Sequence, residues 1–416
     1  MTVYSHSSPA LSLGTNIVAL SKIGEGMFGS VYQCVDEYQN KFACKTCEPK
    51  DHGIPNLMEL SIMSSIIHPH LNRALCIRVD GDAVDIIQEI AVTDLSKHVA
   101  STPYISIHLK RQWIYQMISA IRVLHQCNIV HADIKANNVL LYSDNSVRLT
   151  DYTLSSIDHS SRNTRVVCNN MHRPIECLLK RPWGKPLDVW SLGCTVYHIV
   201  YGRSPFYHTR KEATSLRPTC VLNSILQWFT DSPWDQGSIS DLNLESPCNS
   251  ESADHCKFHL PSTFNLPENA EVNRLLGRML QIIPSRRATI DELLQDKWFN
   301  GLTAQEHRIQ SPAVQSLPTS QRTKYYRMVK SLCDDYKSEI RDDMFRLAIS
   351  ICERTHTLPI FTDGLRCHTA VWMSAKLLGV KQTVRTVRPH ELFEAERVIC
   401  RHLNYNLISP LMSNIT

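Results

Sequence analysis

Between residues 17 and 90, short runs of β-prone residues alternate with turn-prone residues. Runs of this kind predict strands at residues 17–20, 31–35, 41–45 and 84–89. The apolar spacing of residues 57–67 instead suits a helix. This part of the chain is therefore expected to be a small, mostly antiparallel sheet that carries one helix.

From residue 109 to residue 299 the spacing becomes helical, as in Trp113, Met117, Ile121 and Leu124, which predicts a second, helical lobe. Residues 307–323 are rich in Ser, Pro, Gln and Thr and are typical of a linker. Helical spacing returns beyond them and continues to Leu403. We expect four parts: a flexible tail (1–15), a two-lobed domain (16–300), a linker (301–323) and an all-helical module (324–416).

Composition narrows the class of protein. The 416 residues are 43% hydrophobic and 20% charged, which indicates a globular chain and excludes global disorder. A net charge of +4 gives no electrostatic case for nucleic acid or membrane as a partner. The most apolar stretch, 191–202, is too short for a membrane span, and the N-terminus lacks the pattern of a secretion signal. We expect an intracellular protein, either nuclear or cytoplasmic.

Fifteen cysteines lie mostly in apolar runs of this long chain, which favours buried free thiols over a disulfide scaffold. Cys44 and Cys47 form a C-x-x-C pair, but no second pair or suitably spaced histidine accompanies them. A zinc site there is not expected.

Gly24, Gly26 and Gly29 form a G-x-G-x-x-G motif. Glycines in a turn explain such spacing equally well, and dinucleotide-binding folds use a similar motif. A dinucleotide site needs the glycines to open a helix, whereas the residues from Ser30 to Val35 continue as a strand. We therefore favour a hairpin whose backbone amides cover a triphosphate.

Lys45 follows in an otherwise apolar strand, where a charge needs a partner. Glu59, on the next predicted helix, is the natural one. An ion pair between them would direct the lysine at the α- and β-phosphates. The alternative is an ordinary surface lysine.

Residues 131–138 read His-Ala-Asp-Ile-Lys-Ala-Asn-Asn and lie between a helix and a strand. Asp133 suits acceptance of a proton from a substrate hydroxyl, and Lys135 suits neutralising charge on a transferred phosphoryl group. Asn138 and, after the next strand, Asp151 suit a metal ion. Each alone could be a polar loop residue, but their order and spacing together favour phosphate transfer.

At this point the chain resembles the eukaryotic protein kinase family over residues 16–300. The motifs are the glycine-rich loop, Ala43-Cys44-Lys45, Glu59, the 131–138 loop, Asp151, Arg173-Pro174-Ile175-Glu176, Asp188-Val189-Trp190-Ser191-Leu192-Gly193 and Arg287. The resemblance implies an α+β, bilobal kinase fold, with a small β-rich lobe and a large helical lobe, that uses ATP and Mg²⁺ on protein substrates. It assigns catalysis to Asp133 and Lys135 and metal binding to Asn138 and Asp151. The implied ATP-binding residues are Ile23, Gly24, Glu25, Gly26, Met27, Phe28, Gly29, Val31, Ala43, Lys45, Glu59, Glu89 and Ala91.

By the same likeness, Glu89 and Ala91 offer hinge backbone to adenine, Gln88 is the gatekeeper, and Glu176 pairs with Arg287. Among kinases the chain looks most like the cyclin-dependent group, including an insert that contains residues 224–229 and 241–258. Lys135 fits the Ser/Thr class. Four departures stand out: Ala132 replaces the usual arginine, Thr153 the usual glycine after Asp151, Pro174-Ile175-Glu176 the usual Ala-Pro-Glu, and Asn169 the usual threonine.

Residues 324–416 fit a generic helical bundle, but they also resemble a single cyclin box. In that family a lysine and a glutamate at the positions of Lys376 and Glu396 pair between helices on the kinase-binding face. The resemblance implies an intramolecular partner that activates the kinase.

Thr164 matches the threonine that is phosphorylated in the cyclin-dependent group. The three positions where arginines usually bind that phosphate are here Met58, Ala132 and Ser156. Phosphorylation of Thr164 is therefore expected to change the kinase activity little. Two alternatives to an active kinase stay open: a pseudokinase scaffold, and a cyclin-like module that acts on another kinase in trans.

Overall fold

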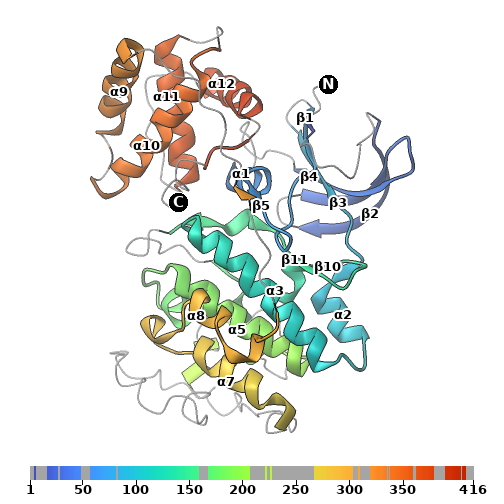
Figure 1. The fold of residues 1–416 in the computed structure, drawn as a ribbon. Coiled ribbons are helices and arrows are strands. Elements are labelled where there is room, and N and C mark those ends of the chain that lie inside the picture. Colours follow the sequence, from blue (N-terminus) through green and yellow to red (C-terminus); the bar gives the residue numbers. More distant parts are fainter. Residues whose placement is uncertain are drawn as a thin grey trace, which may run out of the picture. The chain divides into compact units, whose positions relative to one another are not determined.

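The computed structural model describes residues 4–5, 16–26, 29–47, 57–80, 83–158, 167–206, 221–222, 225–226, 267–302, 308–309, 319–334, 336, 338–358, 362–378, 389–403 and 405–408. The chain divides into two compact units (Figure 1). One unit combines Met1–Ala91 with Glu306–Thr416, and the other is Val92–Gln305. The C-terminal helices therefore share a unit with the N-terminal sheet.

The first unit contains a six-stranded antiparallel sheet in the order β1-β6-β7-β4-β3-β2. Its strands are β1 (Tyr4–Ser5), β2 (Val18–Gly26), β3 (Gly29–Val35), β4 (Lys41–Cys47), β6 (Cys76–Asp80) and β7 (Ala83–Glu89). The four predicted strands are confirmed as β2, β3, β4 and β7. β1 lies in the segment expected to be a flexible tail, where it pairs with β6. The buried side chains of Cys34, Phe42, Cys44, Cys76 and Ile87 lie on one face of this sheet and pack against one another.

Helix α1 (Leu57–Ser65) is buried at every one of its residues. It ends two residues earlier than predicted, because Ile66–Ile67 form a short strand, β5. β5 pairs antiparallel with β13 (Arg308–Ile309), which comes from the segment expected to be a linker. Helix α11 also contacts α1. C-terminal residues thus touch both α1 and the strand that follows it.

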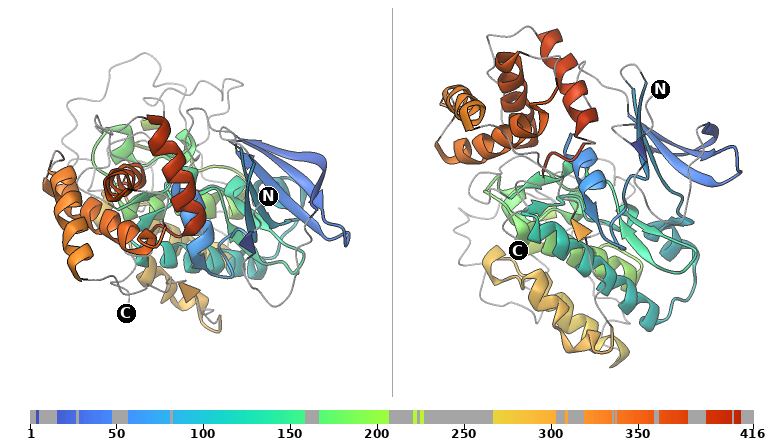
Figure 2. Two further views of the ribbon diagram at one scale, coloured as in Figure 1. Left: turned by 90° about the horizontal axis from the view of Figure 1, so that it is seen from above. Right: turned by 45° about the horizontal axis from the view of Figure 1, so that its top comes forward.

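The predicted C-terminal helices are present as α9 (Thr319–Cys333), α10 (Ser338–Thr355), α11 (Asp363–Leu377) and α12 (Pro389–His402) (Figure 2). α11 contacts each of the other three. Its buried residues include Cys367, Ala370, Val371 and Ala375, so that the predicted apolar stripe forms the centre of this helical group.

The second unit is mainly helical, as predicted. Its helices are α2 (Leu95–Ser101), α3 (Ile107–Gln126), α4 (Ile175–Leu178), α5 (Lys185–Tyr201), α7 (Ala270–Met279) and α8 (Ile290–Leu294). The strands β8 (Thr93–Asp94), β10 (Val139–Leu141) and β11 (Val147–Leu149) form one small sheet, and β9 (Ile129–Val130) pairs with β12 (Ser156–Ile157). Trp113 on α3 and Trp190 on α5 are fully buried and anchor the core.

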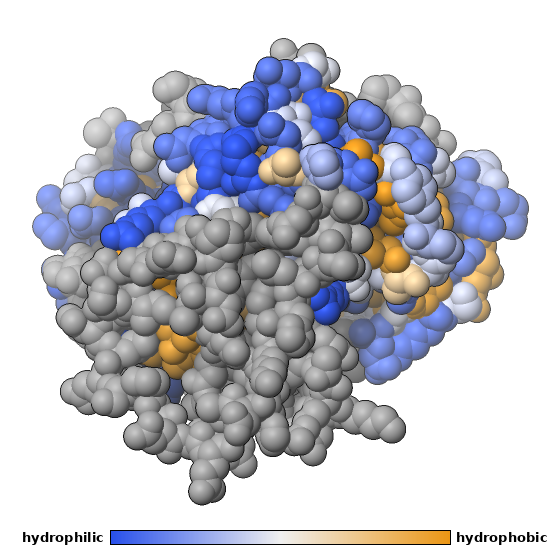
Figure 3. Space-filling view, turned by 90° about the horizontal axis from the view of Figure 1, so that it is seen from below, coloured by the Kyte–Doolittle hydropathy of each residue, from blue (hydrophilic) through white to orange (hydrophobic). Residues whose placement is uncertain are grey.

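The described surface on the face drawn in Figure 3 is largely hydrophilic, with smaller apolar areas. In the described part of the chain, no helix has the length and apolar character that crossing a membrane requires. The described cysteines are buried and free, as expected from their apolar surroundings. Residues 227–266, which contain most of the expected insert, lie outside the described residues.

Candidate active site

The glycine-rich motif lies on the hairpin of β2 and β3. Gly26 is paired with Gly29 at its tip, and the predicted turn residues Met27 and Phe28 lie outside the described residues. A Cβ atom at Gly29 would lie 2.2 Å from the backbone oxygen of Thr46, so no side chain fits there. The motif continues as a strand, as predicted, and does not open a helix as a dinucleotide-binding site requires.

The other predicted residues of this loop follow the same hairpin. Gly24 lies opposite Val31. Ile23 is 45% exposed, and exposed Glu25 forms an ion pair with Lys22. Apolar and backbone groups are thus available along the hairpin, while the contact of each with ATP stays a prediction.

Lys45 and Glu59 form the ion pair that the sequence predicts. The Nζ atom of Lys45 lies 2.7 Å and 2.9 Å from the two carboxylate oxygens of Glu59. The Glu59 side chain is 3% exposed and that of Lys45 is 15% exposed, so each charge compensates the other away from water. Lys45 lies opposite Val31 and two residues from Ala43, which places all three side chains on one face of the sheet.

The residues expected to form the hinge lie at the end of β7 and directly after it. Gln88, the expected gatekeeper, is buried opposite Ala43, and its side-chain oxygen accepts a hydrogen bond from the Asn72 amide. Glu89 is the last residue of β7, and Ala91 is the last residue of this part of the first unit. Binding of adenine by the backbone of Glu89 and Ala91 stays a prediction.

In the second unit, the structure brings Asp133, Lys135 and Asn138 together. Lys135 Nζ lies 2.6 Å from Oδ2 of Asp133. The Asn138 amide donates to the same oxygen at 2.9 Å and to the Asp133 backbone oxygen at 2.8 Å. Because both side chains bind Oδ2, Oδ1 is the carboxylate oxygen that remains for a substrate hydroxyl.

Asp188 on α5 holds the backbone that leads to Asp133. This fully buried carboxylate accepts hydrogen bonds from the backbone N–H groups of His131 at 2.8 Å and Ala132 at 2.9 Å. His125 Nε2 lies 2.9 Å from it. Ala132 has a φ of +63°, a conformation that residues other than glycine rarely adopt. The sequence placed Asp188 within a kinase motif but did not predict that it binds the backbone of the 131–138 loop. A charged residue in an apolar helix was the signal that could have indicated a buried polar contact.

Asp151 also has a left-handed backbone, with a φ of +64°. Thr153, which replaces the usual glycine, donates from its hydroxyl to Oδ1 of Asp151 at 2.6 Å. Tyr152 is fully buried, bonds the Leu149 backbone oxygen at 2.8 Å and packs against the His131 ring at 5.4 Å. The threonine thus contacts the carboxylate directly, which sequence reasoning missed.

Asn138 and Asp151 fit the chemistry of a Mg²⁺ site. The Asn138 amide nitrogen is engaged by Asp133, so its carbonyl oxygen is the atom suited to a metal ion. Mg²⁺ in phosphate-transfer sites takes one or two side-chain oxygens and completes its shell with water and substrate phosphates. No group of three or more His, Cys, Asp or Glu residues that could hold a metal ion occurs among the described residues.

Glu176 and Arg287 form the second predicted ion pair. Two guanidinium nitrogens of Arg287 lie 2.6 Å and 2.8 Å from the two carboxylate oxygens of Glu176. The Arg287 side chain is fully buried. The pair joins the start of α4 to the turn before α8, and its prediction is confirmed.

The comparisons with known proteins agree with these observations. The protein kinase domain model matches residues 17–299, more than half of the chain. Aurora kinase from Eremothecium gossypii is 31% identical over 204 residues, which are 47% of this chain and 55% of the relative. Aurora kinase from Debaryomyces hansenii is 27% identical over 288 residues (67% and 60%), and human NUAK family SNF1-like kinase 2 is 28% identical over 290 residues (68% and 40%).

The chain belongs to the protein kinase domain family. The predicted class, a Ser/Thr protein kinase, is confirmed at the level of the family. The aligned parts span 40–60% of the length of the three relatives named above. The relatives named above are Aurora and NUAK kinases and do not include a cyclin-dependent kinase or a cyclin. The expected likeness to the cyclin-dependent group and to a cyclin box therefore stays a prediction.

Proposed function

We propose that this chain transfers the γ-phosphoryl group of ATP to serine or threonine hydroxyls of proteins. The observation that carries the proposal is the Asp133 carboxylate, which is bound on one oxygen by Lys135 and Asn138 and is buried at 7% exposure. Phosphoryl transfer depends mainly on positioning and charge stabilisation. Asp133 orients the hydroxyl and accepts its proton, and Lys135 neutralises charge on the transferred group.

The remaining charged groups suit the nucleotide. Lys45, held by Glu59, binds the α- and β-phosphates. Asn138 and Asp151 hold Mg²⁺, which when bound neutralises negative charge on the β- and γ-phosphates. The hairpin around Gly29 brings backbone amides to the phosphates because no side chain intervenes there.

Replacing Asp133 by Asn tests the proposal. Phosphate transfer from radiolabelled ATP to a mixed protein substrate should fall by about 10²- to 10⁴-fold, since general-base catalysis contributes on that scale. ATP affinity, measured by calorimetry, should stay within about twofold of the wild type, because no phosphate contact is removed. Asp144→Asn, the same change in an exposed turn, is the matched control. An Asp133→Asn protein as active as the wild type would overturn the assignment.

A scaffold that binds nucleotide without transfer is the second candidate. The Thr153 hydroxyl favours it, because its hydrogen bond to Oδ1 of Asp151 competes with a metal ion for that oxygen. In the same assay, a scaffold would bind ATP while neither the wild type nor Thr153→Gly transferred phosphate. Transfer that rises in Thr153→Gly would instead show an active kinase that this threonine restrains.

We also propose that the C-terminal helices activate the kinase in cis by seating α1. α11 contacts α1, which carries Glu59, and β13 pairs with the strand directly after α1. The cyclin-like resemblance agrees with one further contact: Lys376 Nζ lies 2.6 Å and 2.8 Å from the carboxylate oxygens of fully buried Glu396. The helix that positions Lys45 would then depend on the C-terminal helices.

The double variant Lys376→Ala/Glu396→Ala tests this activation. Coupling of about 1–3 kcal/mol between the helices and the kinase site predicts a loss of about 5- to 150-fold in transfer. Lys324→Ala/Asp363→Ala removes another pair within the same helices, one with an exposed lysine, and serves as the control. Deletion of residues 324–416 should also reduce transfer strongly. Full activity in both the double variant and the deletion would exclude activation in cis and favour a role in trans.

A further inference from the structure

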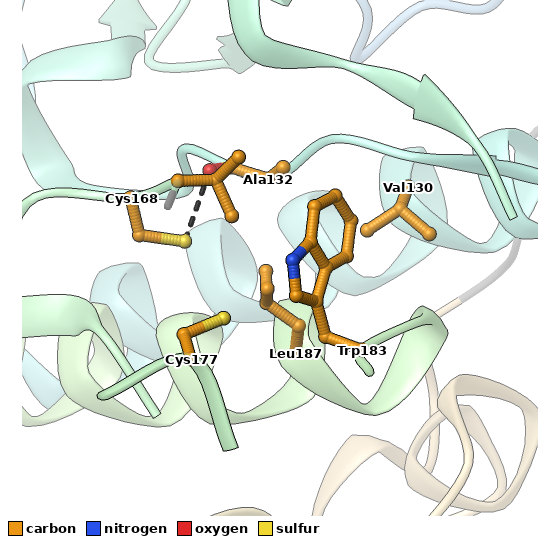
Figure 4. Close-up of a cluster of buried hydrophobic side chains, with 7 residues drawn as sticks. Val130, Ala132, Cys168, Cys177, Trp183 and Leu187 are labelled. Carbon is orange, nitrogen blue, oxygen red and sulfur yellow. Dashed lines mark hydrogen bonds between the residues drawn. The ribbon is translucent and has the colours of Figure 1, made fainter. Parts of the chain in front are cut away.

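In the second unit, Val167 and Cys168 pack against the loop of residues 131–138, here called the catalytic loop, in a small apolar cluster (Figure 4). Its members are all buried, and Leu154 packs against them. They are Val130, Ala132, Val167, Cys168, Cys177, Trp183 and Leu187. Ala132 takes the place of the arginine that is usual at this position, so this contact is apolar where a charge is expected.

One hydrogen bond crosses this cluster. The Cys168 thiol donates to the backbone oxygen of Ala132 at a sulfur–oxygen distance of 2.9 Å, as the dashed line in Figure 4 shows. Cys168 Sγ also lies 3.8 Å from the Ser191 hydroxyl on α5. Burial raises the pKa of the Cys168 thiol well above its usual range, so the sulfur keeps its proton and remains a donor at neutral pH.

Cys168 is itself held in an unusual backbone conformation, with a φ of +62°. Arg173 stabilises this conformation, because its guanidinium donates to the backbone oxygens of Val167 at 2.9 Å and Cys168 at 2.7 Å. The backbone that carries the thiol is therefore held in place by contacts other than the hydrogen bond to Ala132. A strained residue that its surroundings hold so firmly is typical of functional sites.

The carbonyl that Cys168 binds belongs to the peptide bond between Ala132 and Asp133. This peptide is planar, so fixing its oxygen also fixes the direction of the Asp133 N–H, which donates to His131 Nδ1 at 3.2 Å. On the preceding peptide, the Ala132 N–H is bound by Asp188 at 2.9 Å. Asp188 and Cys168 thus hold the backbone of Ala132 from both sides.

We propose that Cys168 is a positioning residue for Asp133, which it aligns through the Ala132 carbonyl without any charged group. The proposal rests on the proposed kinase function. The Cys168 thiol then links the segment that contains Cys168 to the catalytic loop that contains Ala132. This link is an uncharged hydrogen bond and needs no phosphate on the chain.

The test compares three variants by steady-state kinetics and by hydrogen exchange. In Cys168→Ala, kcat should fall about 3- to 10-fold, the effect of losing one hydrogen bond, while KM for ATP stays unchanged. Cys168→Ser keeps a donor and should return kcat to within about twofold of the wild type. Cys177→Ala is the matched control, since this buried cysteine lies in the same cluster and bonds no catalytic-loop carbonyl among the described residues.

Hydrogen exchange of residues 129–138 separates this idea from the kinase assignment. Amide exchange there should accelerate in Cys168→Ala but not in Cys168→Ser or Cys177→Ala, even in a protein without transferase activity. A wild type without phosphate transfer but with this exchange pattern would refute the kinase function and keep the positioning role. Equal behaviour of Cys168→Ala and Cys177→Ala, or a Cys168→Ser no better than Cys168→Ala, would overturn the positioning role.

Discussion

Replacement of Arg287 by Ala should be among the most damaging single changes in the second unit. Its fully buried guanidinium binds both oxygens of Glu176 and also donates to the backbone oxygens of Gln281 at 2.8 Å and Pro186 at 3.0 Å. The alanine variant leaves a buried carboxylate without its counter-charge and removes the guanidinium donor from the backbone oxygens of Gln281, Pro186 and Ile282. Removing one partner of such a pair costs about 3–5 kcal/mol of the free energy of unfolding.

An exposed pair of the same length supplies the control. Arg122 Nε lies 2.6 Å from Asp291, as Arg287 lies 2.6 Å from Glu176, but the Arg122 and Asp291 side chains are 40% and 59% exposed. Arg122→Ala should cost only about 0.2–1 kcal/mol, because water screens the exposed pair. Burial, not distance, therefore sets the difference between the two variants.

Urea titration and thermal unfolding measure both variants. At about 2–4 °C per kcal/mol, Arg287→Ala should lower Tm by about 6–20 °C and Arg122→Ala by at most about 4 °C. The combined variant Glu176→Leu/Arg287→Met should recover most of the loss, since apolar groups of similar volume leave no buried charge. An Arg287→Ala protein that loses no more stability than Arg122→Ala would contradict the large cost assigned to the buried pair.

Two further predictions concern pH and phosphorylation. His172 is buried, neither ring nitrogen has a hydrogen-bond partner among the described residues, and burial lowers its pKa from 6.5 to about 3. The His172 ring takes up a proton more readily in the unfolded chain than in the folded one, so the free energy of unfolding should fall as the pH drops from 6.5 toward 3. His172→Leu removes this proton uptake and should flatten the pH dependence of urea unfolding between pH 7 and pH 5. Thr164→Ala should keep most transferase activity, because the three positions expected to bind its phosphate carry no arginine; an inactive, fully folded variant would show that phosphorylation is needed.

The ion pairs could be predicted from the sequence because their logic is simple. Lys45 and Glu396 lie in apolar surroundings, where each charge needs a partner. Glu59, on the next predicted helix, was the natural partner of Lys45, whereas the pair of Lys376 with Glu396 followed only from the resemblance to a cyclin box. The four longest strands of the first unit, β2, β3, β4 and β7, and the long helices were likewise visible in their periodicity, whereas the five-residue strand β6 was not predicted.

Other features depend on long-range geometry that periodicity does not carry. The two-residue strands β1, β5 and β13 have no pattern of their own and exist only because a distant segment pairs with them. The bond from Cys168 to Ala132 joins residues 36 positions apart, and both residues adopt a positive φ. Propensity assigns that conformation to glycine, so neither residue would be chosen from the sequence.

The pairing of the N-terminal sheet with the C-terminal helices has a consequence for synthesis on the ribosome. This unit is discontinuous, because residues 92–305 separate its two segments. At about 5–20 residues per second, roughly 10–45 s pass between the appearance of the two segments. During that interval α1, every residue of which is buried in the finished fold, has no C-terminal cover. The nascent chain therefore presents apolar helix surface for far longer than a helix takes to form, which makes this interval a point of demand for chaperones and of risk for misassembly.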